Sequence, residues 1–95
     1  MREEPPTIKL DGEVDLSTVE EFRSAIDQLL AKGHGLTVDL SDVSFIDSTG
    51  LGLICETAVK MNGAGPLVLK NPSQVARMVL EILGVSRISS LKIEG

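Results

Sequence analysis

The sequence predicts an α/β domain with a mostly parallel or mixed sheet of four to five strands, connected by crossover helices. Short apolar segments of strand length alternate with longer segments of helical periodicity along the whole chain. A length of 95 residues with 42% hydrophobic residues is enough for one modest core. We see no linker, repeat or low-complexity segment. We therefore expect residues 1–95 to form a single domain, in which residues 1–6 are a flexible or extended N-terminal segment.

The first strand and helix are predicted between Thr7 and Gly33. Residues 7–10 alternate, with Ile8 and Leu10 directed inward. The segment Ser17-Thr18-Val19-Glu20 has the capping-box pattern and predicts a helix start. Gly33 is suited to the left-handed position that ends the helix. The buried stripe of this helix consists of Val19, Phe22, Ile26, Leu29 and Leu30.

A second strand and helix follow. Residues 36–40 alternate as a strand, and residues 41–44 form a loop that leads to the turn at residues 47–48. Leu53 falls among polar side chains on the predicted helix and is expected to be exposed. Such a leucine is either part of a partner surface or an ordinary exposed apolar residue. The apolar face consists of Leu51, Ile54, Ala58 and Met61.

The last third of the chain predicts one more helix between two strands. Residues 66–70 are a short apolar run that is compatible with a buried strand. Asn71 and Pro72 mark a helix start, and Gly84 marks its end. The buried face of this helix is expected to consist of Val75, Val79, Ile82 and Leu83. Weak apolar alternation at Ile88, Leu91 and Ile93 suggests the final strand.

Composition and charge argue against several classes of function. The net charge is −5, the sequence has no Lys/Arg cluster, and its only aromatic residues are Phe22 and Phe45, so nucleic-acid binding is disfavoured. No stretch of about 18 apolar residues exists, and residues 1–6 lack the hydrophobic region of a signal peptide. We expect a soluble, cytoplasmic protein without a membrane partner. Cys55 lies beside the predicted apolar helix face and is read as a small core residue.

Ser48 stands where a negative charge is favourable. The first four N–H groups of a helix have no acceptor within the helix, and the helix dipole places partial positive charge there. Serine is a favoured N-cap type, so Ser48 is one candidate for the cap of the second helix. A phosphate on or beside Ser48 would meet the free N–H groups.

Catalytic sites are not supported by the residues around this turn. Gly50 and Gly52 give only part of a dinucleotide-binding pattern, and the phosphate-loop motif is absent. His34, the only histidine, is expected at the opposite edge of the sheet, so no base is available to Ser48. The acids Asp39, Asp42 and Asp47 have no histidine or cysteine companion and are read as a solvated edge rather than as metal ligands. We expect no cofactor and no metal, and we interpret the chain as the substrate of an enzyme rather than as an enzyme.

The motif Asp47-Ser48-Thr49-Gly50-Leu51-Gly52, with Gly12-Glu13-Val14-Asp15-Leu16 upstream, resembles the STAS domain of bacterial anti-sigma factor antagonists. The resemblance extends from about Thr7 to Ile93 and implies a single STAS-like domain. It also implies that a partner that is both serine kinase and anti-sigma factor phosphorylates Ser48. The unphosphorylated domain would bind this partner and release a sigma factor, and phosphorylation would switch binding off. A metal-dependent serine phosphatase would then restore the active form.

On this basis we predict a partner surface around Ser48, with Thr49 as the second-choice acceptor. Gly50 and Gly52 either let a kinase approach Ser48 or allow close packing against the strand. Asp47 either orients Ser48, or contacts the kinase's nucleotide-associated metal, or caps the helix. The predicted partner-binding residues are Asp15, Ser17, Asp47, Ser48, Thr49, Gly50, Gly52, Leu53 and Glu56.

The resemblance leaves two points open. The segment before Thr7 is short and contains Pro5 and Pro6 where many relatives have an additional edge strand, so an open edge could pair with another copy in a homodimer. An alternative function is a non-catalytic STAS regulatory subunit of another complex, such as a lipid-transport ATPase. Weak nucleotide binding or hydrolysis at the helix start is a third, less favoured reading.

Overall fold

The computed structural model describes residues 6–31, 35–61, 65–82, 84 and 91–95. Strands and helices alternate along these residues, as the sequence predicts. The four described strands are all parallel and lie in the order β1-β2-β3-β4, so the sheet is fully parallel rather than mixed. The elements are β1 (Thr7–Val14), α1 (Val19–Leu30), β2 (Leu36–Ile46), α2 (Ser48–Met61), β3 (Leu67–Lys70), α3 (Gln74–Ile82) and β4 (Leu91–Glu94).

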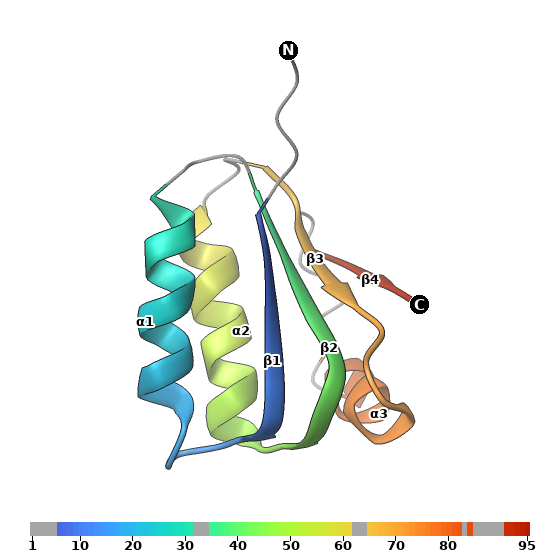
Figure 1. Cartoon of the computed structure of the whole chain (residues 1–95). Coiled ribbons are helices and arrows are strands. Elements are labelled where there is room, and N and C mark those ends of the chain that lie inside the picture. Colours follow the sequence, from blue (N-terminus) through green and yellow to red (C-terminus); the bar gives the residue numbers. More distant parts are fainter. Residues whose placement is uncertain (1–5, 32–34, 62–64, 83, 85–90) are drawn as a thin grey trace.

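Two helices cover the first half of the sheet. In Figure 1, α1 and α2 stand side by side next to β1 and β2, and α3 lies apart from them. The carboxyl ends of β1 and β2 and the N-termini of α1 and α2 gather at the lower end of the picture. The backbone N–H of Asp47 donates to the carbonyl of Val14 at 3.3 Å, which joins the two strand ends. The turns after β1 and β2 are therefore neighbours.

Both β1 and β2 are longer than predicted. β1 continues to Val14, and β2 continues to Ile46, so the segment expected as a loop, which includes Ser41 and Ser44, is part of a strand. The pairing register of β1 with β2 shifts twice, between Lys9 and Asp11 and again between Gly12 and Glu13. Such irregularities interrupt the inward and outward alternation of side chains. The predicted strand ends depend on this alternation, and for this reason they are wrong.

The stripe of α1 is confirmed, but its capping box is wrong. Val19 and Ile26 are buried, and Phe22, Leu29 and Leu30 pack against the core. The residue before the helix is Thr18, whose side chain makes no capping hydrogen bond. The Ser17 hydroxyl instead donates to Asp15 Oδ1 at 2.6 Å, and Glu20 pairs with Arg23. The predicted end at Gly33 lies outside the described residues, as does His34.

The expectation that Leu53 is exposed is wrong. Its side chain is 1% exposed and belongs to the core, and the polar residue Thr57 is buried as well. Helix α2 contacts both α1 and β2, so it is covered on two sides and needs an apolar arc wider than a single stripe. The Thr57 hydroxyl donates to the Leu53 carbonyl at 2.7 Å, so burial leaves it hydrogen-bonded. Cys55 is half-buried and packs against the core, as predicted.

The C-terminal elements follow the prediction with one correction. Ser73 caps α3, because its Oγ accepts the N–H of Ala76 at 3.1 Å. The buried face of α3 contains Ala76 and Leu80, whereas Ile82, which was predicted to be buried, is 78% exposed. Val79, also predicted to be buried, is half-buried and packs against the core, so the buried face is turned toward Ala76 and Leu80 and away from Ile82. Gly84, which was predicted to mark the helix end, follows α3 and has the left-handed conformation.

Strands β3 and β4 form where they were predicted. The side chains of Val75 and Leu83, and all of Ile88 and residues 1–5, lie outside what the structure describes. None of the helices among the described residues is long and apolar enough to cross a membrane.

Candidate functional site

The N-terminus of α2 is capped by Asp47. Asp47 Oδ1 accepts the N–H of Gly50 at 3.0 Å, and the Asp47 carbonyl accepts the N–H of Leu51 at 2.9 Å. These are the side-chain and main-chain bonds of an N-cap residue. Of the two candidate caps, Ser48 and Asp47, the structure shows Asp47. Of the three roles considered for Asp47, capping is the one that the structure shows.

Ser48 is the first residue of α2, and it is exposed. In the part of the chain that the structure describes, the Ser48 hydroxyl has no hydrogen-bond partner, so nothing there restrains it. Thr49 is half-buried and Gly50 is buried. Of the two candidate acceptors, Ser48 is therefore the more accessible one.

The two glycines of the motif have different surroundings. A Cβ atom on Gly50 would lie 2.5 Å from the Val14 carbonyl oxygen and 2.7 Å from Ile46 Cγ1. Gly50 is thus required for the close approach of α2 to the ends of β1 and β2, which favours the packing interpretation. A Cβ atom on Gly52 would meet nothing within 4 Å. Packing therefore does not explain the presence of glycine at residue 52.

The turn between β1 and α1 is held together by hydrogen bonds. Asp15 Oδ1 accepts the backbone N–H of Ser17 at 2.9 Å and the Ser17 hydroxyl at 2.6 Å. The Thr18 hydroxyl accepts the N–H of Asp15 at 3.1 Å and donates to the Glu13 carbonyl at 2.8 Å. The Ser17 hydroxyl is the main cause that holds the pKa of the Asp15 carboxyl below its ordinary value. Asp15 and Ser17, both predicted as partner contacts, therefore bond to each other.

This turn and the start of α2 enclose a shallow depression of about 360 Å³, which is lined by Asp15, Leu16, Ser17 and Asp47. The structure thereby brings together the predicted residues of both loops. Leu16 on its rim is 77% exposed, and it is not among the partner-binding residues that the sequence predicts. The sequence does contain a sign that Leu16 is exposed. If Ser17 were the N-cap, Leu16 before it would pack against the fourth residue of the helix, but that residue is Glu21, which is polar.

Glu56 is part of an ion-pair network between α1 and α2. Arg23 Nε donates to Glu56 Oε2 at 2.9 Å, and Lys60 Nζ lies 3.1 Å from Glu56 and 3.0 Å from Asp27. The hydrogen bond from Arg23, followed by that from Lys60, holds the pKa of Glu56 below its ordinary value. Glu56 therefore ties the two helices together two turns beyond Ser48.

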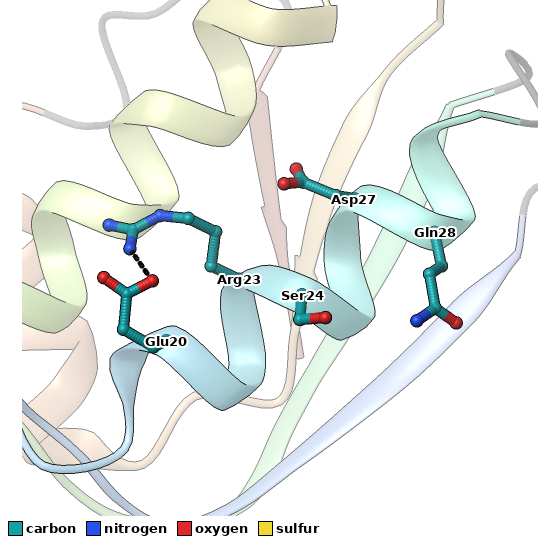
Figure 2. A pocket seen from close by; sticks show the side chains of 5 residues that line it. All are labelled: Glu20, Arg23, Ser24, Asp27 and Gln28. Carbon is teal, nitrogen blue, oxygen red and sulfur yellow. Dashed lines mark ion pairs between the residues drawn. The ribbon is translucent and has the colours of Figure 1, made fainter.

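A second hollow, of about 420 Å³, runs along α1 and lies outside the candidate site. Figure 2 shows Arg23 extending from α1 toward α2, with Glu20 paired beside it. No residue of the α2 start contributes to this hollow. It is lined by Glu20, Arg23, Ser24, Asp27 and Gln28.

Comparison with known proteins gives one family. Residues 1–93 match the family model described as "Mlab, STAS domain". The "Anti-sigma-B factor antagonist" of Bacillus subtilis (strain 168) is 36% identical over 92 residues, which cover 93% of this chain and 84% of the relative. The "Anti-sigma F factor antagonist" of Lysinibacillus sphaericus is 34% identical over 85 residues, which cover 86% of this chain and 73% of the relative.

Solved structures agree with this assignment. The anti-sigma factor antagonist SpoIIAA in its unphosphorylated form is 27% identical with a TM-score of 0.78, over 100% of this chain and 84% of that one. The Bacillus cell fate determinant SpoIIAA in the phosphorylated form is also 27% identical, with a TM-score of 0.72, over 100% of this chain and 86% of that one. The fold described above is therefore similar to both forms of that protein.

Proposed function

The chain belongs to the STAS domain family, and we propose that it is an anti-sigma factor antagonist that is switched off by phosphorylation of Ser48. The observation that carries the proposal is the accessible Ser48 hydroxyl at the first position of α2, directly after the capping Asp47. The relatives that match most of the chain are anti-sigma factor antagonists, which supports the same function.

The switch acts through charge at the surface. A phosphate on Ser48 adds about −1.5 to −2 charge. It would lie next to the Asp47 carboxylate and close to the turn that contains Asp15. A partner that docks on the unmodified surface would then have to bury a dianion beside two carboxylates, which is unfavourable in free energy. Phosphorylation therefore weakens binding without refolding the domain, and the similarity of this fold to both forms of SpoIIAA supports that view.

The partner is an anti-sigma factor that is also the serine kinase for Ser48, and a metal-dependent serine phosphatase removes the phosphate. The chain itself is the substrate in both reactions and performs no catalysis. Its contact surface consists of Asp15, Ser17, Asp47, Ser48, Thr49 and Gly52. Leu53 is left out because its side chain is buried, and Gly50 and Glu56 serve packing and helix pairing.

The test is intact-mass analysis and peptide mapping after incubation with each purified anti-sigma factor of the source bacterium and Mg-ATP. We expect one phosphate, on Ser48, and no modification of the Ser48→Ala variant. The Thr49→Ala variant is the matched control and should still accept one phosphate. A phosphate on Thr49, or no phosphate with any of these proteins, contradicts the proposal. Recovery of a transporter ATPase in place of an anti-sigma factor would favour the regulatory-subunit alternative.

A further inference from the structure

We infer that Leu16 is the apolar anchor by which the anti-sigma factor kinase recognises this chain, and that the Asp15–Thr18 turn holds it in place. This inference rests on the proposed function and adds to it a residue that determines affinity for the partner. The side chain of Leu16 is apolar and 77% exposed, and it lies on the rim of the depression beside Ser48.

The turn fixes the position of Leu16 before any partner arrives. The residues on both sides of it are bonded to each other, because Asp15 Oδ1 accepts both the N–H and the hydroxyl of Ser17. The Thr18 hydroxyl closes the turn from the other side, because it accepts the N–H of Asp15 and donates to the carbonyl of Glu13. A side chain on a preformed turn loses less conformational entropy when it is bound than one on a flexible loop. The local hydrogen bonds thus favour Leu16 as a contact residue.

A kinase interface of standard size that is centred on Ser48 covers Leu16. Leu16 and Asp47 line the same depression, and Ser48 follows Asp47 directly in the chain. A standard protein–protein interface covers about 800 Å² on each partner, which corresponds to a disc roughly 16 Å in radius. A disc of this size centred on Ser48 includes the depression and its rim. Leu16 therefore passes from water into the interface when the kinase binds.

The chemistry of the depression indicates what the kinase presents to it. The depression is lined by one apolar side chain, that of Leu16, and by two acidic residues, Asp15 and Asp47. The complementary surface is an apolar pocket for Leu16 with basic side chains at its edge. Phosphorylation of Ser48 places a dianion next to this pocket, so the leucine cannot be buried without also desolvating the phosphate. The anchor and the switch thereby act on the same surface.

Val59 supplies a matched control. It is as exposed as Leu16, at 77%, but it lies on α2 eleven residues after Ser48, roughly 16 Å along the helix axis and thus at the outer edge of the interface, where residues contribute little to affinity. The variants Leu16→Ala and Val59→Ala therefore both remove an exposed apolar side chain. Of these two residues, only Leu16 borders the depression.

The experiment measures affinity and phosphorylation of four proteins, wild type, Leu16→Ala, Leu16→Met and Val59→Ala, with the purified anti-sigma factor kinase that modifies the wild type. We expect Leu16→Ala to weaken binding and to lower kcat/KM for phosphorylation by at least tenfold. Leu16→Met should largely retain both values, and Val59→Ala should stay within twofold of wild type. Circular dichroism confirms that all four are folded.

The two proposals fail in different ways. If the wild type is phosphorylated on Ser48 but Leu16→Ala behaves like Val59→Ala, the role of Leu16 is overturned and the proposed function stands. If no anti-sigma factor of the source bacterium binds or modifies the wild type, the proposed function is overturned, and the role of Leu16 with it.

Discussion

Gly50 lies so close to Val14 that a methyl group on Gly50 would come within 2.5 Å of the Val14 carbonyl oxygen. The same carbonyl accepts the N–H of Asp47. The end of β1 and the start of α2 are therefore locked together at the point where Ser48 is exposed. Because the β1–α1 turn follows Val14 directly, the lock also fixes Ser48 relative to Asp15 and Leu16.

Replacement by alanine should change the free energy of unfolding in opposite directions at the two motif glycines, Gly50 and Gly52. The Gly50→Ala methyl group would overlap backbone, so we expect a loss of roughly 1–3 kcal/mol in the free energy of unfolding. The Gly52→Ala variant meets nothing within 4 Å and should gain about 0.5–1 kcal/mol, because glycine is unfavourable inside a helix. Urea unfolding of both variants checks this pair, and equal effects would contradict the packing account of Gly50.

Asp47 should be replaceable by asparagine but not by alanine. Asparagine also accepts the Gly50 N–H, so Asp47→Asn should change the free energy of unfolding little, whereas Asp47→Ala should lower it by about 1 kcal/mol. Chemical denaturation measures both. Two variants of equal stability would mean that the carboxylate is not the cap.

The Leu53→Ala and Leu16→Ala variants should differ in stability, although both remove a leucine side chain near the site. Leu53→Ala removes a side chain that is 1% exposed and should destabilise the domain by roughly 2–5 kcal/mol. Leu16→Ala removes a side chain that is 77% exposed and should stay within about 0.5 kcal/mol of wild type. Thermal and urea unfolding compare the two. A mild effect of Leu53→Ala would restore the idea that Leu53 is a surface residue.

The Arg23–Glu56 pair should affect how the free energy of unfolding depends on pH in the acidic range. The pKa of Glu56 is lowered from its ordinary value of 4.5, chiefly by the hydrogen bond from Arg23. The folded state therefore binds this proton less readily than the unfolded state does, and stability rises with pH through this range. The contribution is fully present above pH 4.5 and is lost as the pH falls through the lower pKa of the folded state.

Glu56→Gln should accordingly show a flatter loss of stability on acidification than wild type, and high salt should reduce the difference. Part of the acid dependence should remain, because the pKa values of Asp15 and Asp39 are lowered as well. Glu21→Gln, which removes an exposed carboxylate from α1, is the control. Urea unfolding as a function of pH is the measurement, and identical curves for the two variants would contradict the role of the pair.

The sequence predicts the order of elements because each element has a strong periodic signal of its own. The predicted strands end too early because the β1–β2 register shifts, and each shift interrupts the apolar and polar alternation by which a strand is recognised. Leu53 was misplaced because a helical wheel shows one helix, whereas the burial of α2 depends on both α1 and β2. Such tertiary contacts lie outside the reach of local periodicity.

The candidate site was predicted in its location but not in its details. The Asp47-Ser48 turn was found because a helix start has free donors wherever it occurs. The choice of cap between Ser48 and Asp47 depends on a single residue of helix phase, which propensities do not resolve, since both residues are good caps. Leu16 was missed because its exposure depends on the Asp15–Ser17 hydrogen bonds, which redirect the serine that was expected to cap α1.

The affinity of the purified anti-sigma factor kinase for Ser48→Ala and Ser48→Asp tests the central claim most directly. Both variants remove the hydroxyl and block phosphorylation of residue 48, and they differ in the negative charge at the first position of α2. We expect Ser48→Ala to bind like the unphosphorylated wild type and Ser48→Asp to bind at least tenfold more weakly. Equal affinities of the two variants would contradict the claim that charge at Ser48 switches this domain off.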